Sequence, residues 1–142
     1  HFRGGEKLCT GWLGEFQAGL AICYDLRFPE QFRAMLPETE IFIVAANWPA
    51  ARASHWKTLL AARAIENQCY VAGVNCCGDM DGQHYSGDSG VYAPDGSLLV
   101  PTKEIRLTDA LCKEEKLLVY DVQNDVAKIR KAFPVLQDRK EM

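Results

Sequence analysis

Residues 19–30, GLAICYDLRFPE, change within a few positions from an apolar run to alternating charge. The apolar part is short and compatible with a β-strand, and Asp25 and Pro29 end it. We therefore expect a buried strand over 15–23. Ligands of open α/β sheets bind beyond the carboxyl ends of the strands, so Cys23 is a candidate nucleophile. The alternative is a small, packed core residue.

The segments that follow continue an alternation of helix and strand. Pro29 suits a first helical position, and Phe32 and Met35 give an apolar side to a short helix over 30–35. Residues 41–46, IFIVAA, are a second strand that is apolar throughout. Such strands are covered on both faces, so we expect an α/β fold with its sheet inside.

The strongest helix signal covers residues 54–68, with Ser54 as the expected N-cap. Its inward face is expected to carry Trp56, Leu59, Leu60, Arg63, Ala64 and Asn67. The further expected elements are a strand over 70–75, a loop over 78–82, a hairpin of strands over 90–92 and 97–100 about a turn at 94–96, a strand over 117–122, a helix over 126–133 and a polar tail over 134–142. No repeat or linker divides the chain, which indicates one domain or part of one.

The composition is that of a globular domain. The chain has 142 residues, of which 48% are hydrophobic and 25% charged, and a formal net charge of -3. The charges are scattered, so no basic stripe would follow a phosphate backbone, and the apolar runs fall short of the ~20 residues that cross a bilayer. We expect a soluble, cytoplasmic protein that binds neither nucleic acid nor membrane.

Most of the six cysteines lie in apolar or strand-like contexts, where reduced thiols pack as small hydrophobic side chains. They are Cys9, Cys23, Cys69, Cys76, Cys77 and Cys112. No C-x-x-C pair or Cys/His spacing typical of zinc occurs, so we expect no metal. The chain opens at His1 without a methionine or the start of an element, which suggests a fragment that begins inside a domain.

Two other catalytic patterns compete with a role for Cys23 alone. The segment 87–90, GDSG, is similar to the serine nucleophile of trypsin-like proteases, but Val91 replaces the expected second glycine and a long helix is foreign to that fold. A papain-like pair of Cys23 with His55 or His84 has the right order but lacks the C-G-x-C-W signature. Both patterns are poor matches.

A series of short motifs runs through essentially the whole chain. They are CYDLRFPE at 23–30, NWP at 47–49 with Arg52 and His55-Trp56, ARAIENQ at 62–68, YVAGVN at 70–75, YSG at 85–87, PDG at 94–96, Ile129-Arg130 and FPV at 133–135. Together they resemble the nitrilase superfamily of carbon–nitrogen hydrolases, and most of all its bacterial omega-amidase branch. The resemblance implies that residues 1–142 are the C-terminal portion of one nitrilase-fold domain, part of a four-layer αββα sandwich whose N-terminal part is absent.

The resemblance also implies a Glu-Lys-Cys triad in which Cys23 is the nucleophile. It attacks an amide carbon, ammonia leaves, and water hydrolyses the thioester, while the lysine and the backbone N–H of Tyr24 stabilise the oxyanion. The family's glutamate and lysine lie upstream of the position of His1, and neither Glu6 nor Lys7 is taken as a substitute. Because triad members act as a unit, we expect this chain alone to be nearly inactive.

Other candidate residues border the same strand edge. Asn47 and Trp48 follow the second apolar strand and are expected to line the substrate pocket, with plain packing as the alternative. Arg52 is a candidate to hold a substrate carboxylate by a bidentate pair, with a helix-surface role as the alternative. Arg27 and Glu66 are expected to form structural ion pairs.

The expected function is that of an amidohydrolase releasing ammonia from a small omega-amide such as 2-oxoglutaramate, without a cofactor. One alternative is another carbon–nitrogen hydrolase of the superfamily, acting on a carbamoyl or nitrile group. The other is a non-catalytic nitrilase-like module that only dimerises; the resemblance implies pairing through the helices over 30–35 and 54–68 and through the C-terminal tail. The expected partners are a small amide and further copies of the chain in a homo-oligomer, a dimer or larger.

Overall fold

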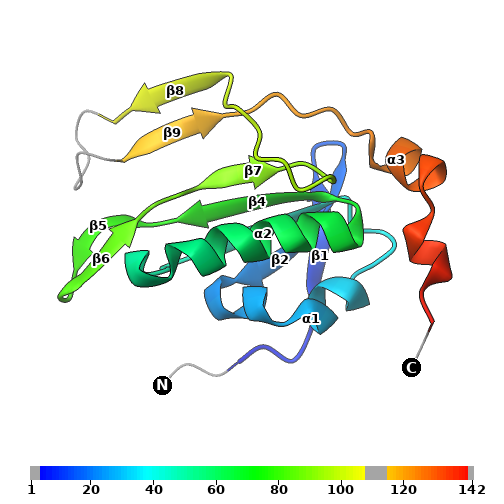
Figure 1. The fold of residues 1–142 in the computed structure, drawn as a ribbon, viewed down its shortest axis with the longest axis horizontal. Helices are drawn as coiled ribbons and strands as arrows, with labels where there is room; N and C mark the ends of the chain where they lie inside the picture. The colour runs from blue at the N-terminus through cyan, green and yellow to red at the C-terminus, as the bar shows by residue number, and fades with distance from the viewer. Residues whose placement is uncertain (1–3, 108–114, 141–142) are drawn as a thin grey trace.

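The computed structural model describes residues 4–107 and 115–140 of the chain. A central sheet has the strand order β1-β2-β3-β4-β7. Its strands are β1 (Cys9–Leu13), β2 (Phe16–Ile22), β3 (Ile41–Ala46), β4 (Tyr70–Asn75) and β7 (Gly90–Tyr92). Strands β2, β3 and β4 are parallel, and β1 and β7 pair antiparallel at the two edges (Figure 1). The carboxyl ends of the three parallel strands therefore meet at one edge.

Helices α1 and α2 cover one face of this sheet (Figure 1). The helical elements are η1 (Cys23–Arg27), α1 (Pro29–Ala34), η2 (Ala50–Arg52), α2 (Ala53–Asn67), α3 (Val126–Ala132) and η3 (Val135–Asp138). Phe32 of α1 and Trp56 and Leu60 of α2 are fully buried in one cluster with Phe42 of β3. Burial of each such side chain contributes about 1.5–3 kcal/mol, which explains why apolar sequence alone predicted an α/β fold with these elements.

The opposite face of the sheet is covered in part. Val126 of α3 packs there with Ile41 and Tyr70, toward the amino ends of β3 and β4. Toward the carboxyl ends, Leu20, Ile22 and Val74 are 49%, 71% and 56% exposed. Ala45 of β3 pairs with Ile22 of β2 on one side and with Val74 of β4 on the other, so these three residues form one row across the sheet. Leu20 lies in the neighbouring row on the same face. We call Leu20, Ile22, Ala45 and Val74 the open sheet face.

Two small hairpins project from this body, and both correct the expected structure. β5 (Cys77–Met80) pairs with β6 (Gln83–Ser86), so the loop expected over 78–82 was wrong: its Asp81 and Gly82, both at positive φ, form the turn. β9 (Lys116–Val119) is shorter than the strand expected over 117–122, and its partner β8 (Lys103–Arg106) was not expected.

Other expectations meet mixed outcomes. The strands over 15–23, 41–46 and 70–75 and the helices over 30–35, 54–68 and 126–133 are confirmed, although β2 ends at Ile22 and Cys23 belongs to η1. The expected cover on both faces of the sheet was wrong at its carboxyl edge, where the open sheet face is exposed. Ser54 is not the N-cap, because η2 runs directly into α2 and Arg52 takes that position without a side-chain bond. The turn at 94–96 forms, but in place of a strand over 97–100 there is an isolated bridge between Tyr92 and Leu98. Cys112 lies outside the described residues.

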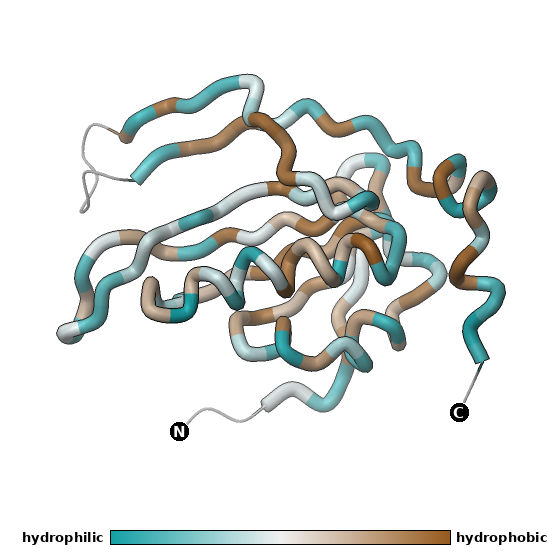
Figure 2. The backbone as a smooth tube through the Cα atoms, in the orientation of Figure 1, coloured by the Kyte–Doolittle hydropathy of each residue, from teal (hydrophilic) through white to brown (hydrophobic). Residues whose placement is uncertain are grey.

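The distribution of hydropathy follows the fold. Hydrophobic backbone segments gather among the sheet and α2, whereas the β5–β6 tip and the end of the chain are hydrophilic (Figure 2). None of the described helices is long and apolar enough to cross a membrane. Within 4–107 and 115–140, no cluster of three or more His, Cys, Asp or Glu side chains has the arrangement to hold a metal ion.

Candidate active site

Cys23 is the first residue of η1, directly after β2, and its φ is 46°. A non-glycine residue in this left-handed region costs of order 1 kcal/mol and persists only where its surroundings hold it. Here the backbone N–H of Ile22 donates to Asp25 Oδ2 at 2.9 Å, and that of Phe28 donates to Asp25 O at 2.9 Å. The chain therefore turns sharply at the residue that carries the thiol.

The neighbours of the Cys23 thiol come from the adjacent strand ends. Its Sγ lies 3.9 Å from the carbonyl oxygen of Asn47, the residue after β3. Cys76 follows β4, and its N–H donates to Ala46 O at 3.1 Å. Burial raises the pKa of the Cys76 thiol, and the neighbouring Cys23 raises it further. The structure thus places Cys23, Asn47 and Cys76 together at the carboxyl edge of the sheet.

Trp48 is held by its surroundings. Its ring is buried, lies 5.5 Å from that of Trp56, and donates from Nε1 to Arg52 O at 2.8 Å. The Arg27 guanidinium lies over it, 4.7 Å from the ring centroid, and 5.9 Å from the centroid of the exposed Tyr24 ring. Such cation–π contacts are attractive by about 0.5–1 kcal/mol at exposed sites. Trp48 is therefore part of the helical core and borders the Cys23 turn through Arg27.

The expected ion pairing of Arg27 with Glu66 was wrong. Glu66 accepts instead from Arg63 Nη1 at 2.9 Å and from Arg33 Nη2 at 3.3 Å, while Arg27 stacks on aromatic rings. Arg63 is on the same helix as Glu66, at the i, i+3 spacing that brings side chains together. Glu66 is therefore paired with two arginines of the helical layer, Arg63 and Arg33.

Tyr24 and Arg52 have groups available to a substrate. The Tyr24 N–H is the second of a short helix, where amides lack a partner inside the helix. The Arg52 side chain is exposed on η2 and has no hydrogen bond or ion pair within the described residues. One is a candidate oxyanion donor and the other a candidate carboxylate ligand.

The competing catalytic patterns do not assemble. His84 bonds an aspartate of its own hairpin at 2.9 Å, and Ser89 Oγ donates to Asn75 O at 3.2 Å. His55 lines a surface cavity of about 230 Å³ at the start of α2. In the part of the chain that the structure describes, no hydrogen bond joins either histidine to Cys23 or to Ser89.

Sequence reasoning missed Asn75, the last residue of β4. Its Nδ2 donates to Trp48 O at 3.0 Å and to Gly87 O at 2.8 Å, and its backbone N–H donates to Ser89 Oγ at 2.9 Å. Asn75 therefore fixes two loops beside the candidate site. The available signal was its position, because an amide that directly follows an apolar strand lies at the same edge as Cys23.

Comparison with known proteins places the chain in a family. The sequence profile named Carbon-nitrogen hydrolase matches residues 4–131, so the chain belongs to the carbon–nitrogen hydrolase family. It is 40% identical over 141 residues to Omega-amidase YafV of Yersinia enterocolitica, covering 97% of this chain and 51% of that protein. It is 36% identical to 2-oxoglutaramate amidase of Bacillus subtilis strain 168, covering 82% and 42%. The chain spans about half the length of these curated relatives.

Solved structures agree with this assignment. XC1258 from Xanthomonas campestris, a CN-hydrolase superfamily protein with an arsenic adduct in its active site, matches with a TM-score of 0.81 and 33% identity, over 99% of this chain and 53% of that one. A C145A mutant of the Nesterenkonia sp. AN1 amidase, in complex with butyramide, matches with a TM-score of 0.64 and 31% sequence identity. The match covers 69% of this chain and 38% of that one. The expected nitrilase-type fold and the likeness to omega-amidases are confirmed.

Proposed function

We propose that this protein is an amidohydrolase that releases ammonia from a small omega-amide such as 2-oxoglutaramate, with Cys23 as its nucleophile. The observation that carries the proposal is the turn at Cys23, where a thiol follows a parallel strand at a left-handed residue beside Asn47. The relatives named Omega-amidase and 2-oxoglutaramate amidase support the substrate class.

The proposed reaction proceeds in two steps. The Cys23 thiolate adds to the amide carbonyl carbon, and the Tyr24 N–H donates to the oxyanion. The C–N bond then breaks as the nitrogen takes up a proton, ammonia leaves, and a thioester remains. A base removes a proton from water, whose hydroxyl adds to the thioester carbon. The C–S bond breaks, which returns the thiolate and frees the carboxylic acid.

The base and the lysine of the triad are proposed to come from the rest of the domain. In this proposal residues 1–142 are the C-terminal portion of a single nitrilase-fold domain, and the N-terminal portion adds a second sheet and helical layer. The open sheet face supports this, because Leu20, Ile22 and Val74 expose apolar surface beside Cys23. A sheet packed about 10 Å away would bury them and bring its own side chains to the thiol.

Three residues are proposed to bind the substrate. The carbonyl oxygen of Asn47 lies 3.9 Å from the Cys23 Sγ, and the buried Trp48 ring holds that loop in place. The exposed Arg52 is proposed to hold the carboxylate at the far end of an omega-amide, because a guanidinium binds a carboxylate through two parallel bonds. No cofactor enters this scheme.

The proposed assembly is a homo-oligomer formed through the α1–α2 layer. Exposed apolar side chains on this layer, Phe28 and Ile65, support the choice. Sedimentation of the complete protein would test it, with a monomer as the contrary result. We also place the protein in the cytoplasm, where Cys9, Cys23, Cys69 and Cys76 would remain thiols as they are here.

The nucleophile is tested in the complete protein by measuring ammonia release from 2-oxoglutaramate. Cys23→Ala should abolish release, and Cys9→Ala, which changes an exposed thiol on β1, should not. Rapid quenching followed by mass spectrometry should find the acyl group on the peptide that contains Cys23. Turnover by Cys23→Ala would refute the nucleophile. Wild-type turnover of nitriles or carbamoyl compounds alone would replace the substrate class.

A further inference from the structure

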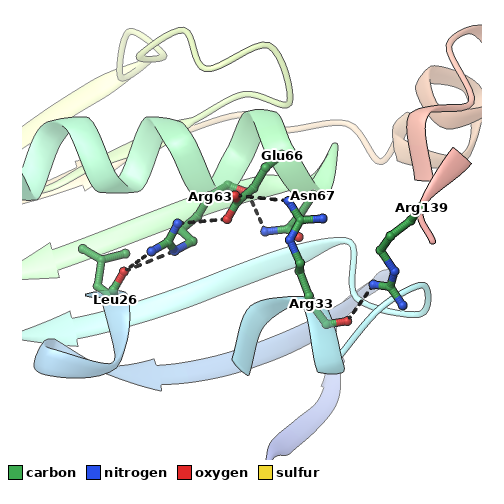
Figure 3. Close-up of polar contacts among 6 residues, drawn as sticks. All are labelled: Leu26, Arg33, Arg63, Glu66, Asn67 and Arg139. Atoms are coloured by element: carbon green, nitrogen blue, oxygen red, sulfur yellow. Dashed lines mark hydrogen bonds and ion pairs between the residues drawn. The ribbon is translucent and has the colours of Figure 1, made fainter. Parts of the chain in front are cut away.

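We propose that Arg63 is a positioning residue that holds the Cys23 turn in its reactive geometry, an inference that rests on the proposed nucleophile. Two nitrogens of the Arg63 guanidinium converge on one carbonyl (Figure 3). Nη2 donates to Leu26 O at 2.8 Å and Nε donates to it at 3.2 Å. Leu26 belongs to η1, the same short turn that begins at Cys23, although Arg63 lies 37 positions further along the chain.

Arg63 is a buried charge at a position where an apolar side chain would stabilise the fold equally well. The Arg63 side chain is 5% exposed, and a buried cation is costly unless it is paired. Its pairing comes from Glu66, whose Oε1 accepts from Nη1 at 2.9 Å, and from the Phe32 ring, whose centroid lies 5.4 Å from the guanidinium carbon. The ion pair thus fixes the direction of the remaining nitrogens toward Leu26.

The turn is held by bonds within its own segment and by one distant side chain. Within the segment, Asp25 accepts from the Ile22 N–H through its carboxylate and from the Phe28 N–H through its carbonyl oxygen, and Arg63 of α2 fixes the Leu26 carbonyl. The left-handed Cys23 and the Tyr24 amide lie within this turn. If the Arg63 contact is lost, Cys23 can relax toward an ordinary φ, because strained residues persist only when their surroundings fix them. Thiol and amide would then move relative to each other.

Arg130 provides a matched comparison within the chain. It also donates to backbone carbonyls from a partly buried guanidinium. Its acceptors are the carbonyl oxygens of Pro37, Thr39, Asn67 and Gln68. None of these belongs to η1. Loss of Arg130 should therefore disturb stability without moving the Cys23 turn.

The test uses the complete protein with Arg63→Lys, which keeps the charge but loses the planar fork, and Arg130→Lys as the matched control. Both should lower the melting temperature. Arg63→Lys should lower kcat for 2-oxoglutaramate about 10- to 100-fold with little change in KM, because misplacement near 1 Å carries a penalty of this size. The rate at which iodoacetamide alkylates Cys23, followed by mass spectrometry, should fall in parallel. Arg130→Lys should leave both rates within about twofold.

Glu66→Gln provides a second route if Arg63→Lys does not fold, because it keeps a hydrogen-bonding partner and removes the charge that pairs with Arg63 and with the more exposed Arg33. It should slow alkylation by a smaller factor than Arg63→Lys. Equal slowing by Arg63→Lys and Arg130→Lys would overturn the proposal, as would wild-type alkylation and kcat in both Arg63→Lys and Glu66→Gln. A wild type without turnover on omega-amides refutes the proposed function instead, and the alkylation comparison still decides the role of Arg63.

Discussion

The carboxamide of Asn75 bonds both backbone groups of Trp48. Its Oδ1 accepts the Trp48 N–H at 2.6 Å, and its Nδ2 donates to the Trp48 carbonyl oxygen at 3.0 Å. The same Nδ2 donates to Gly87 O, in the loop after β6. Only a side chain with both a donor and an acceptor in one plane satisfies these three groups. The loops after β3 and β6 therefore depend on a single amide.

Asn75→Asp should destabilise the protein by about 1–3 kcal/mol, because a carboxylate would face two carbonyl oxygens and leave them without donors. Asn124→Asp is the control, since Asn124 is half-buried and its side chain makes one hydrogen bond among the described residues, to Glu15 O at 3.1 Å. Urea unfolding of the complete protein measures both. Equal midpoints for the two variants would contradict the role given to Asn75.

Gly73→Ala should lower the free energy of unfolding by about 1–3 kcal/mol through overpacking. A Cβ at this position on β4 would lie 2.5 Å from Leu60 Cδ1 and 2.7 Å from Trp56 Cζ2, both on fully buried side chains. Gly11→Ala on β1 meets no atom within 4 Å and should be close to neutral. Thermal melts of both variants measure the difference. A Gly73→Ala variant as stable as the wild type would refute the predicted overpacking.

Arg52→Gln should raise KM for 2-oxoglutaramate about 10- to 100-fold with little change in kcat, the loss expected for a charge-assisted bond to a carboxylate. An uncharged amide of similar length has no carboxylate for Arg52 to bind, so the variant should turn it over with unchanged KM and kcat. The same variant measured on both substrates separates recognition from folding. A parallel loss on the uncharged amide would assign Arg52 a structural role.

Cys69 should resist alkylation in the folded protein at pH 9, while Cys9 reacts. Burial raises the pKa of the Cys69 thiol from 9.0 to about 12. The pKa of Cys69 is higher in the folded protein than in the unfolded chain. Its contribution to the free energy of unfolding is therefore full below pH 9 and is lost as pH rises toward 12. Peptide mass spectrometry measures how far Cys69 and Cys9 are alkylated in the native and in the denatured protein. Rapid native labelling of Cys69 would contradict it.

The elements that the sequence predicted most strongly are those that bury apolar side chains. β3 and α2 carry strong apolar patterns because Phe42, Trp56 and Leu60 face one core. β1 escaped prediction because its side chains are all exposed, and it pairs with β2 through its backbone. The β5–β6 hairpin and strand β8 were likewise not expected, because main-chain bonds hold them and a hydrophobic pattern does not report such bonds.

The same contrast holds at the candidate site. The strand-edge position of Cys23 and Asn47 followed from where apolar runs end, and the structure brings the two together. Their catalytic and binding roles stay predictions. Arg63 was expected on the inward face of its helix, but its acceptor, the carbonyl of Leu26, is a main-chain group that residue types do not encode. The partners of Glu66 depended on which arginine the fold brought nearest.

The four carbonyls bound by Arg130 lie in the connection from α1 to β3 and at the end of α2, where the chain passes into β4. A single guanidinium from the C-terminal helix thus closes both helix-to-strand crossovers. Detachment of α3 would remove the Arg130 hydrogen bonds from both connections at once. Local opening of either connection is therefore coupled to detachment of α3. In hydrogen exchange, amides of these crossovers and of α3 should therefore become labelled together, as one cooperative unit.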